Sequence, residues 1–134
     1  MEANNTDLKL HSAAAVTLGT IIGSPLAGTF LLAQNYRALD NAKAARSCII
    51  WGASTTLIII GLSFFLKLPP LIFPICYTIA LYNLANSLQG PAYRQHIERG
   101  GRKASLWIAV GVGFAYMFVL YGFIRLLALV IDGL

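Results

Sequence analysis

The sequence predicts an all-α protein built as a four-helix transmembrane bundle with up-down topology. Hydrophobic residues make up 57% of its 134 residues, whereas charged residues make up only 11%. Ordinary soluble proteins carry about 25% charged residues, so five acids and ten bases cannot supply the polar shell that water requires. Four apolar stretches are also long enough to cross a bilayer, because about 20 helical residues span its hydrocarbon core. We therefore expect a single membrane domain over residues 1–134.

The four expected helices cover about residues 12–33, 47–66, 69–88 and 105–131. Helix is the expected structure because backbone N–H and C=O groups in lipid must be satisfied within the segment. The third helix is expected to begin at Pro69-Pro70, directly after the second, so these two helices form a tight antiparallel hairpin. Short links between helices favour an up-down bundle. Gly90-Pro91 and Gly100-Gly101 are typical of turns in the last link.

The basic residues are concentrated in the links 34–46 and 89–104, which share one side of the membrane if the chain crosses it four times. These links carry seven bases: Arg37, Lys43, Arg46, Arg94, Arg99, Arg102 and Lys103. Because cytoplasmic loops carry an excess of Lys and Arg, we expect both links in the cytoplasm and both termini on the non-cytoplasmic side. His11 and His96 then lie on opposite sides. The net charge of +5 therefore indicates orientation and does not predict nucleic-acid binding.

Small residues recur along the first two helices at a spacing that favours close packing. On the first helix a small residue occurs at every fourth position, at Ala15, Gly19, Gly23 and Ala27. On the second helix Cys48, Gly52 and Thr56 form a similar stripe. Small-xxx-small spacing lets helix backbones approach closely in lipid. The two stripes pack either within the bundle or against a partner, which is another membrane protein or a second copy of this chain.

Polar residues in the expected spans are the other candidate contacts. Thr78, Tyr82 and Asn86 follow one another at intervals of four on the third helix, with Asn83 nearby. Amides in lipid are expected to face other helices. These residues therefore either hydrogen-bond to other helices of the bundle or line a polar path for a solute. Pro25 removes one hydrogen bond from the middle of the first helix and is expected to kink it.

Arg125 is the only charged residue inside an expected span. It lies near the outer end of the last helix, where its side chain is expected to snorkel to the interface and to pair with Asp132. If Arg125 is buried instead, it becomes a candidate functional contact. The two cysteines, Cys48 and Cys76, lie in apolar segments and are expected to be packing residues.

Catalysis is not expected from this sequence. No phosphate-binding loop, metal cluster or nucleophile with its base is present, so we expect no catalytic residues, no metal and no cofactor. An enzyme acting on lipid through Arg94, His96 and Glu98 is the least favoured hypothesis, because these residues fit a solvated loop that sets orientation.

Gly23-Ser24-Pro25-Leu26-Ala27-Gly28, followed by Asn35-Tyr36-Arg37, resembles a motif in small uncharacterised bacterial multi-pass membrane proteins. This resemblance covers about the first third of the chain and implies a bacterial inner membrane, without an activity to carry over. As a class, membrane immunity proteins against pore-forming toxins are similar, since they are small, multi-pass and lack catalytic residues. Small multidrug-resistance exporters resemble the chain in size only, because they depend on a glutamate in the first helix.

Two functions follow as hypotheses. The favoured one is a non-enzymatic protein that binds another membrane-inserted protein through its helix faces, as an immunity protein or an accessory subunit. The alternative is a small oligomeric channel or carrier for a small solute or ion. Coupled transport normally needs an ionisable group near the middle of the membrane, and no expected span has one there.

Overall fold

The computed structural model describes residues 8–67, 69 and 71–133 of the chain. In chain order the elements are β1 (Lys9–Leu10), α1 (Ala13–Ala38), α2 (Ala42–Phe65), α3 (Ile72–Glu98), β2 (Arg102–Lys103) and α4 (Leu106–Asp132). The predicted all-α class is confirmed. By length and composition, α1, α2 and α4 are apolar enough to cross a membrane, and they indicate a membrane protein. The third helix begins at Ile72 and not at the expected Pro69-Pro70, since Pro69 is not helical and Pro70 lies outside the described residues.

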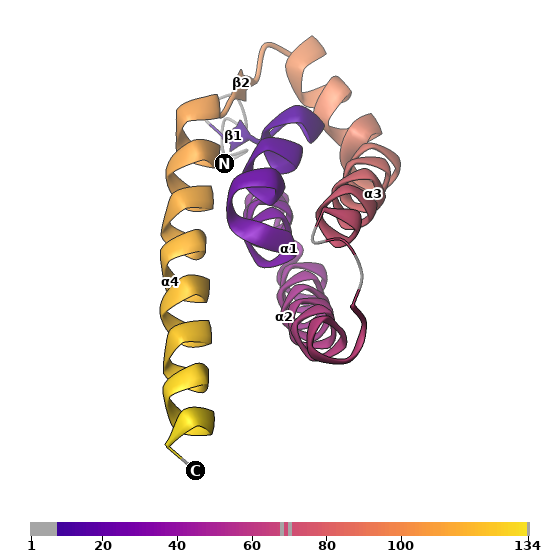
Figure 1. The fold of residues 1–134 in the computed structure, drawn as a ribbon. Helices are drawn as coiled ribbons and strands as arrows, with labels where there is room; N and C mark the ends of the chain where they lie inside the picture. Colours follow the sequence, from indigo (N-terminus) through magenta and orange to yellow (C-terminus); the bar gives the residue numbers. More distant parts are fainter. Residues whose placement is uncertain (1–7, 68, 70, 134) are drawn as a thin grey trace.

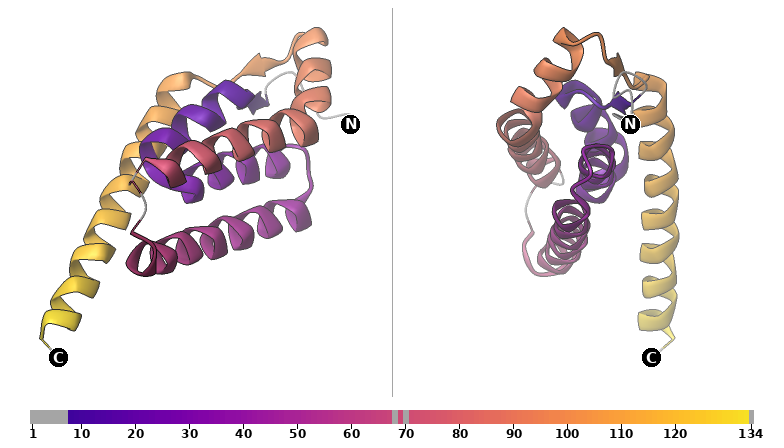
Figure 2. Two further views of the ribbon diagram at one scale, coloured as in Figure 1. Left: turned by 45° about the vertical axis from the view of Figure 1, so that its right-hand side comes forward. Right: turned by 180° about the vertical axis from the view of Figure 1, so that it is seen from behind.

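The chain of α1 reverses its direction at Ser24 (Figure 1). This residue has φ 82° and ψ 173°, a conformation that is otherwise almost confined to glycine. The N–H of His11 donates to Oδ1 of Asn35 over 2.7 Å, whereas a straight helix would separate residues 24 positions apart by about 36 Å. The first half of α1 (residues 13–23) and its second half (residues 25–38) therefore lie antiparallel, as a helical hairpin (Figure 2).

This hairpin takes the place of the straight membrane crossing that was expected for residues 12–33. Pro25 does not kink a continuous helix, because the reversal occurs at Ser24 and Pro25 begins the second half, where its fixed φ suits a first helical position. The first half is about 16 Å long, which is about half of a hydrocarbon core of about 30 Å. The hairpin therefore begins and ends at the same end of the structure. Because α1 is not straight, the protein does not form the expected up-down bundle of four straight crossings.

The residues before α1 lie beside the last link of the chain. Lys9 pairs with Arg102 in a short parallel β1–β2 ladder, and Nε2 of His96 donates to the carbonyl oxygen of Leu8 at 2.8 Å. The expectation that His11 and His96 lie on opposite sides is therefore wrong. The described N-terminal residues share an end with the basic links, whereas the C-terminal end of α4 lies at the opposite end (Figure 1). We call the first of these the basic end.

The two turns expected in the last link have different outcomes. The turn at Gly90-Pro91 does not form, because α3 continues to Glu98. Gln89 explains this result, since its buried side chain donates to the carbonyl of Leu32 at 3.0 Å and holds this part of α3 against α1. The turn at Gly100-Gly101 is confirmed. Gly100 has φ 81°, and both N–H groups return to carbonyls in the last turn of α3, as in a Schellman motif.

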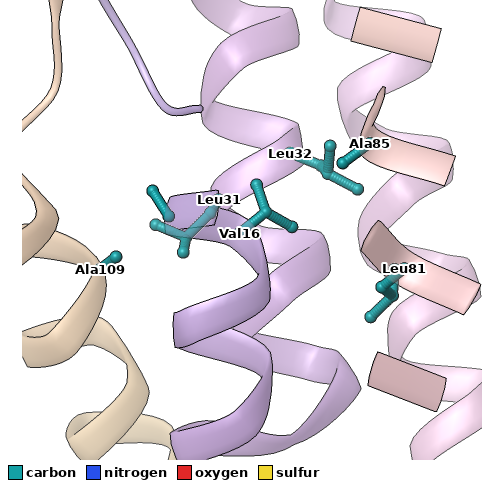
Figure 3. Packing of buried hydrophobic residues seen from close by; sticks show 7 residues of the cluster. Val16, Leu31, Leu32, Leu81, Ala85 and Ala109 are labelled. Carbon is teal, nitrogen blue, oxygen red and sulfur yellow. The ribbon is translucent and has the colours of Figure 1, made fainter. Parts of the chain in front are cut away.

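The α1 hairpin occupies the centre of the molecule. α2, α3 and α4 each pack mainly against α1 rather than against one another (Figure 2). The buried apolar cluster comes from α1, α3 and α4 and consists of Ala15, Val16, Leu31, Leu32, Leu81, Ala85 and Ala109 (Figure 3). Large apolar side chains such as Trp51, Phe65 and Phe118 are exposed on α2 and α4. An apolar surface of this extent belongs in lipid or against a partner.

Candidate functional site

The small-residue stripe of α1 packs inside the chain. Ala15, Gly19, Gly23 and Ala27 are all buried. A Cβ atom on Gly23 would lie 2.7 Å from Cα of Gly113 in α4, so the two backbones are already in contact there. A Cβ atom on Gly19 would meet Leu31 of the opposite half of the hairpin at 2.6 Å. The stripe thus joins the first half of α1 to α4 and to its own second half.

The stripe of α2 faces the second half of α1. A Cβ atom on Gly52 would overlap Thr29, whose hydroxyl donates to the carbonyl of Pro25 at 2.9 Å. Thr56 is buried as well, and its hydroxyl donates to the carbonyl of Gly52 at 2.8 Å. Gly52 and Thr56 are therefore occupied by internal contacts, whereas Cys48 at the start of this stripe is half-buried.

The polar residues expected to form a path lie on different faces of α3. Tyr82 and Asn86 line a cavity against the start of α1. Asn83 is exposed on the outer face, where its amide donates to the carbonyl of Ile79 in its own helix at 3.0 Å. Thr78 is half-buried, and Arg125 is exposed on the part of α4 beyond the core. These side chains do not converge on one pathway.

A buried amide network at the basic end is the polar feature that the sequence did not reveal. Asn35 is 2% exposed. Its Oδ1 accepts from the N–H of His11 at 2.7 Å, and its Nδ2 donates to the carbonyl of His11 at 2.8 Å and to Oε1 of Gln89 at 2.7 Å. The network fastens the segment before α1 to the second half of α1 and to α3. Asn35 belongs to the Asn-Tyr-Arg motif, and this motif was the only feature of the sequence that pointed to the network.

His11 is the buried titratable group of this network. Its side chain is 6% exposed, and Nε2 donates to Oε1 of Gln34 at 2.9 Å. Nδ1 is buried without a hydrogen-bond partner among the described residues. Burial lowers the pKa of His11 from its ordinary value, and the hydrogen bond to Gln34 opposes this effect. The imidazole is therefore neutral at neutral pH, with Nδ1 as an acceptor when Nε2 carries the proton.

An apolar groove separates α2 from α3, and the second half of α1 forms its floor. It consists of two adjoining cavities of about 670 Å³ and 320 Å³, which share Thr29, Trp51 and Leu84. Asn41 and Lys43 lie at the basic end of the groove, and Pro25 and Tyr77 lie at the other end. We call this feature the α2–α3 groove. It exists because α2 and α3 both pack on α1 and leave a gap between themselves.

No family model, curated protein or solved structure matches the chain. A functional assignment therefore depends on the residues and surfaces described above.

Proposed function

We propose that this chain is a non-enzymatic multi-pass membrane protein that binds a transmembrane helix of another protein in the α2–α3 groove. The observation that carries the proposal is the groove itself, which lies between α2 and α3 and is lined mainly by apolar and small side chains. The small-residue stripe of α1 cannot provide this contact, because Ala15, Gly19, Gly23 and Ala27 are already packed inside the chain.

The walls of the groove favour a helix as the occupant. Small side chains line much of them, with Ala44, Ser47 and Cys48 on α2 and Ala80 on α3. Small residues on one helix let the backbone of another approach closely in lipid, where packing and hydrogen bonds drive association. A bound helix would also pack on α2 and α3 together and join two helices that scarcely contact one another.

Charge at the basic end restricts the partner further. Lys43 lines the groove there, and the residues that line its two cavities include no carboxylate in the described part of the chain. The expected partner helix is therefore apolar with a small-residue face, and it carries an acidic residue at the end that meets Lys43. An immunity protein that holds a helix of a pore-forming toxin and an accessory subunit of a membrane complex are two forms of this function.

The orientation that we propose follows from the same basic end. The seven bases of the two links lie there, together with Lys9. The excess of Lys and Arg on cytoplasmic segments supports a cytoplasmic basic end in a bacterial inner membrane. Residues 8–12 are then cytoplasmic, and the C-terminal end of α4 is outside. This replaces the expectation that both termini are non-cytoplasmic.

Photo-crosslinking in the native membrane tests the groove as a binding site. A photoreactive residue at Leu84, inside the groove, is expected to give one discrete protein adduct, whereas the same residue at Leu126, on the exposed part of α4, is expected to give none. Ser47→Trp should abolish the adduct by filling the groove. Lys43→Glu should weaken it by reversing the charge, while Lys67→Glu at the far end of α2 should leave it unchanged.

Three results would contradict the proposal. The first is an adduct at Leu84 that contains only lipid, which would make the groove a lipid site. The second is an adduct of twice the mass of this chain, which would identify a second copy as the occupant. The third is an adduct that Ser47→Trp leaves unchanged although this variant unfolds at the same temperature as the parent protein in detergent.

A further inference from the structure

The basic end contains a second pair of cavities, on the opposite side of α3 from the groove. One has a volume of about 260 Å³ and lies between the first turn of α1 and α3, lined by His11, Tyr82, Asn86 and Arg94 among others. The other has a volume of about 600 Å³ and reaches the start of α4. Ser12, Ala14 and Tyr93 line both, so the two cavities adjoin one another.

The starts of two helices meet at these cavities. Ser12 caps α1, and its hydroxyl oxygen accepts from the N–H of Ala15 at 3.2 Å. Ser105 caps α4 in the same way, through the N–H of Trp107 at 3.3 Å. The first N–H groups of a helix have no partner within the helix and carry a partial positive charge. Such positions bind anions.

The charged side chains around the cavities have one sign. Arg94 lines the smaller cavity, and three further bases line the larger one: Lys9, Arg102 and Lys103. In the described part of the chain neither lining includes a carboxylate. The hydroxyls of Tyr82 and Tyr93 and the amide of Asn86 add neutral donors. The lining therefore suits an anion with several acceptor oxygens.

His11 supplies an independent reason to expect a ligand in the smaller cavity. His11 lines this cavity and is 6% exposed, and its buried Nδ1 has no partner in the described part of the chain. A buried polar group without a hydrogen bond is rare in proteins and costs stability. With Nε2 donating to Gln34, Nδ1 accepts, so the missing partner is a donor such as a hydroxyl.

We propose that the smaller cavity binds a phosphate-bearing anion that also carries a hydroxyl group. The phosphate oxygens accept from Arg94, from the first N–H groups of α1 and from the tyrosine hydroxyls, while the hydroxyl donates to Nδ1 of His11. An anionic phospholipid headgroup with a free hydroxyl and a free phosphate monoanion share this chemistry. Basic pockets between transmembrane helices at the cytoplasmic side are known to hold such headgroups. This inference does not depend on the proposed function of the α2–α3 groove.

Binding to the intact chain in neutral detergent tests the site. The probes are phosphatidylglycerol, phosphatidylcholine and inorganic phosphate, and retained ligand is measured by native mass spectrometry alongside the unfolding temperature. We expect saturable binding of phosphatidylglycerol and not of phosphatidylcholine. Arg94→Gln should weaken this binding about tenfold, since it removes a charged hydrogen bond. Arg99→Gln, an exposed arginine outside both linings, should change it less than about twofold.

The phosphate arm of the experiment separates the two sources of the anion. Saturable binding of inorganic phosphate that Arg94→Gln weakens and Arg99→Gln does not would identify a soluble phosphate as sufficient. Equal losses in the two arginine variants would show general attraction to the basic end and overturn the proposal, as would no saturable binding of either anion. If Arg94→Gln unfolds at a lower temperature than Arg99→Gln without ligand, Tyr82→Phe takes its place and should also weaken binding.

Discussion

Replacing Gly23 with leucine is expected to separate α4 from the hairpin and to lower the free energy of unfolding by about 3 kcal/mol, at the upper end of the range for overpacked sites. A Cβ atom at this position would lie 2.7 Å from Cα of Gly113 and would also meet its carbonyl oxygen. Both are backbone atoms, so no side-chain rotation relieves the contact. Unfolding of the purified protein in a mild detergent, followed by circular dichroism, measures the loss.

Gly111→Leu is the matched control for this change. Gly111 lies on α4 two residues from Gly113, but a Cβ atom there would meet nothing within 4 Å. Its replacement is expected not to lower the free energy of unfolding, because leucine has room there and a higher helix propensity than glycine. A similar loss in both variants, or no loss in Gly23→Leu, would contradict the contact between α1 and α4.

Asn35→Leu is expected to have the second large effect, with a loss of about 3 to 5 kcal/mol. The substitution keeps the approximate size of the side chain but removes its amide. The N–H and carbonyl of His11 and Oε1 of Gln89 then lose the partners that now lie 2.7 to 2.8 Å away. A buried polar group without a partner costs about 1–3 kcal/mol. Chemical unfolding in detergent at constant pH measures the change.

Asn83→Leu is the control for the amide network. Its amide donates only to the carbonyl of Ile79 in its own helix, and its side chain is exposed. The free energy of unfolding is expected to change by less than about 0.5 kcal/mol. The double variant Asn35→Leu with Gln89→Leu should lose less than the sum of the two single changes, because both residues belong to one network. Additive losses would show that Asn35 and Gln89 act independently.

The sequence predicted the existence and type of the helices, because apolar length is a local property that one segment displays by itself. It did not predict the reversal of α1. That reversal depends on the φ angle of Ser24, and Pro25 is compatible both with a kink and with the first position of a new helix. The two half-helices are similarly apolar, so in the sequence they look like one apolar segment that is long enough to cross a membrane. The continuation of α3 through Pro91 likewise depends on the long-range contacts of Gln89.

The candidate sites were less predictable than the helices. Spacing of small residues identified positions of close packing, but Gly19 and Gly23 meet α4 and the other half of the hairpin only once α1 has folded back. The α2–α3 groove arises because α2 and α3 both pack on α1, and no sequence pattern indicates that arrangement. The cavity at His11 is formed by residues that the straight-helix prediction placed on opposite sides of the membrane.

Sided labelling of two single cysteines tests the helical hairpin most directly. In a chain with Cys48→Ala and Cys76→Ala, Lys9→Cys and Gly133→Cys are each treated with a membrane-impermeant maleimide. The label is applied to cells with a permeabilised outer membrane and to inverted inner-membrane vesicles. Because α1 returns to the end at which it began, Lys9→Cys should react only in the vesicles and Gly133→Cys only in the cells. Reaction of both cysteines from the same face would mean that α1 crosses the membrane as a straight helix.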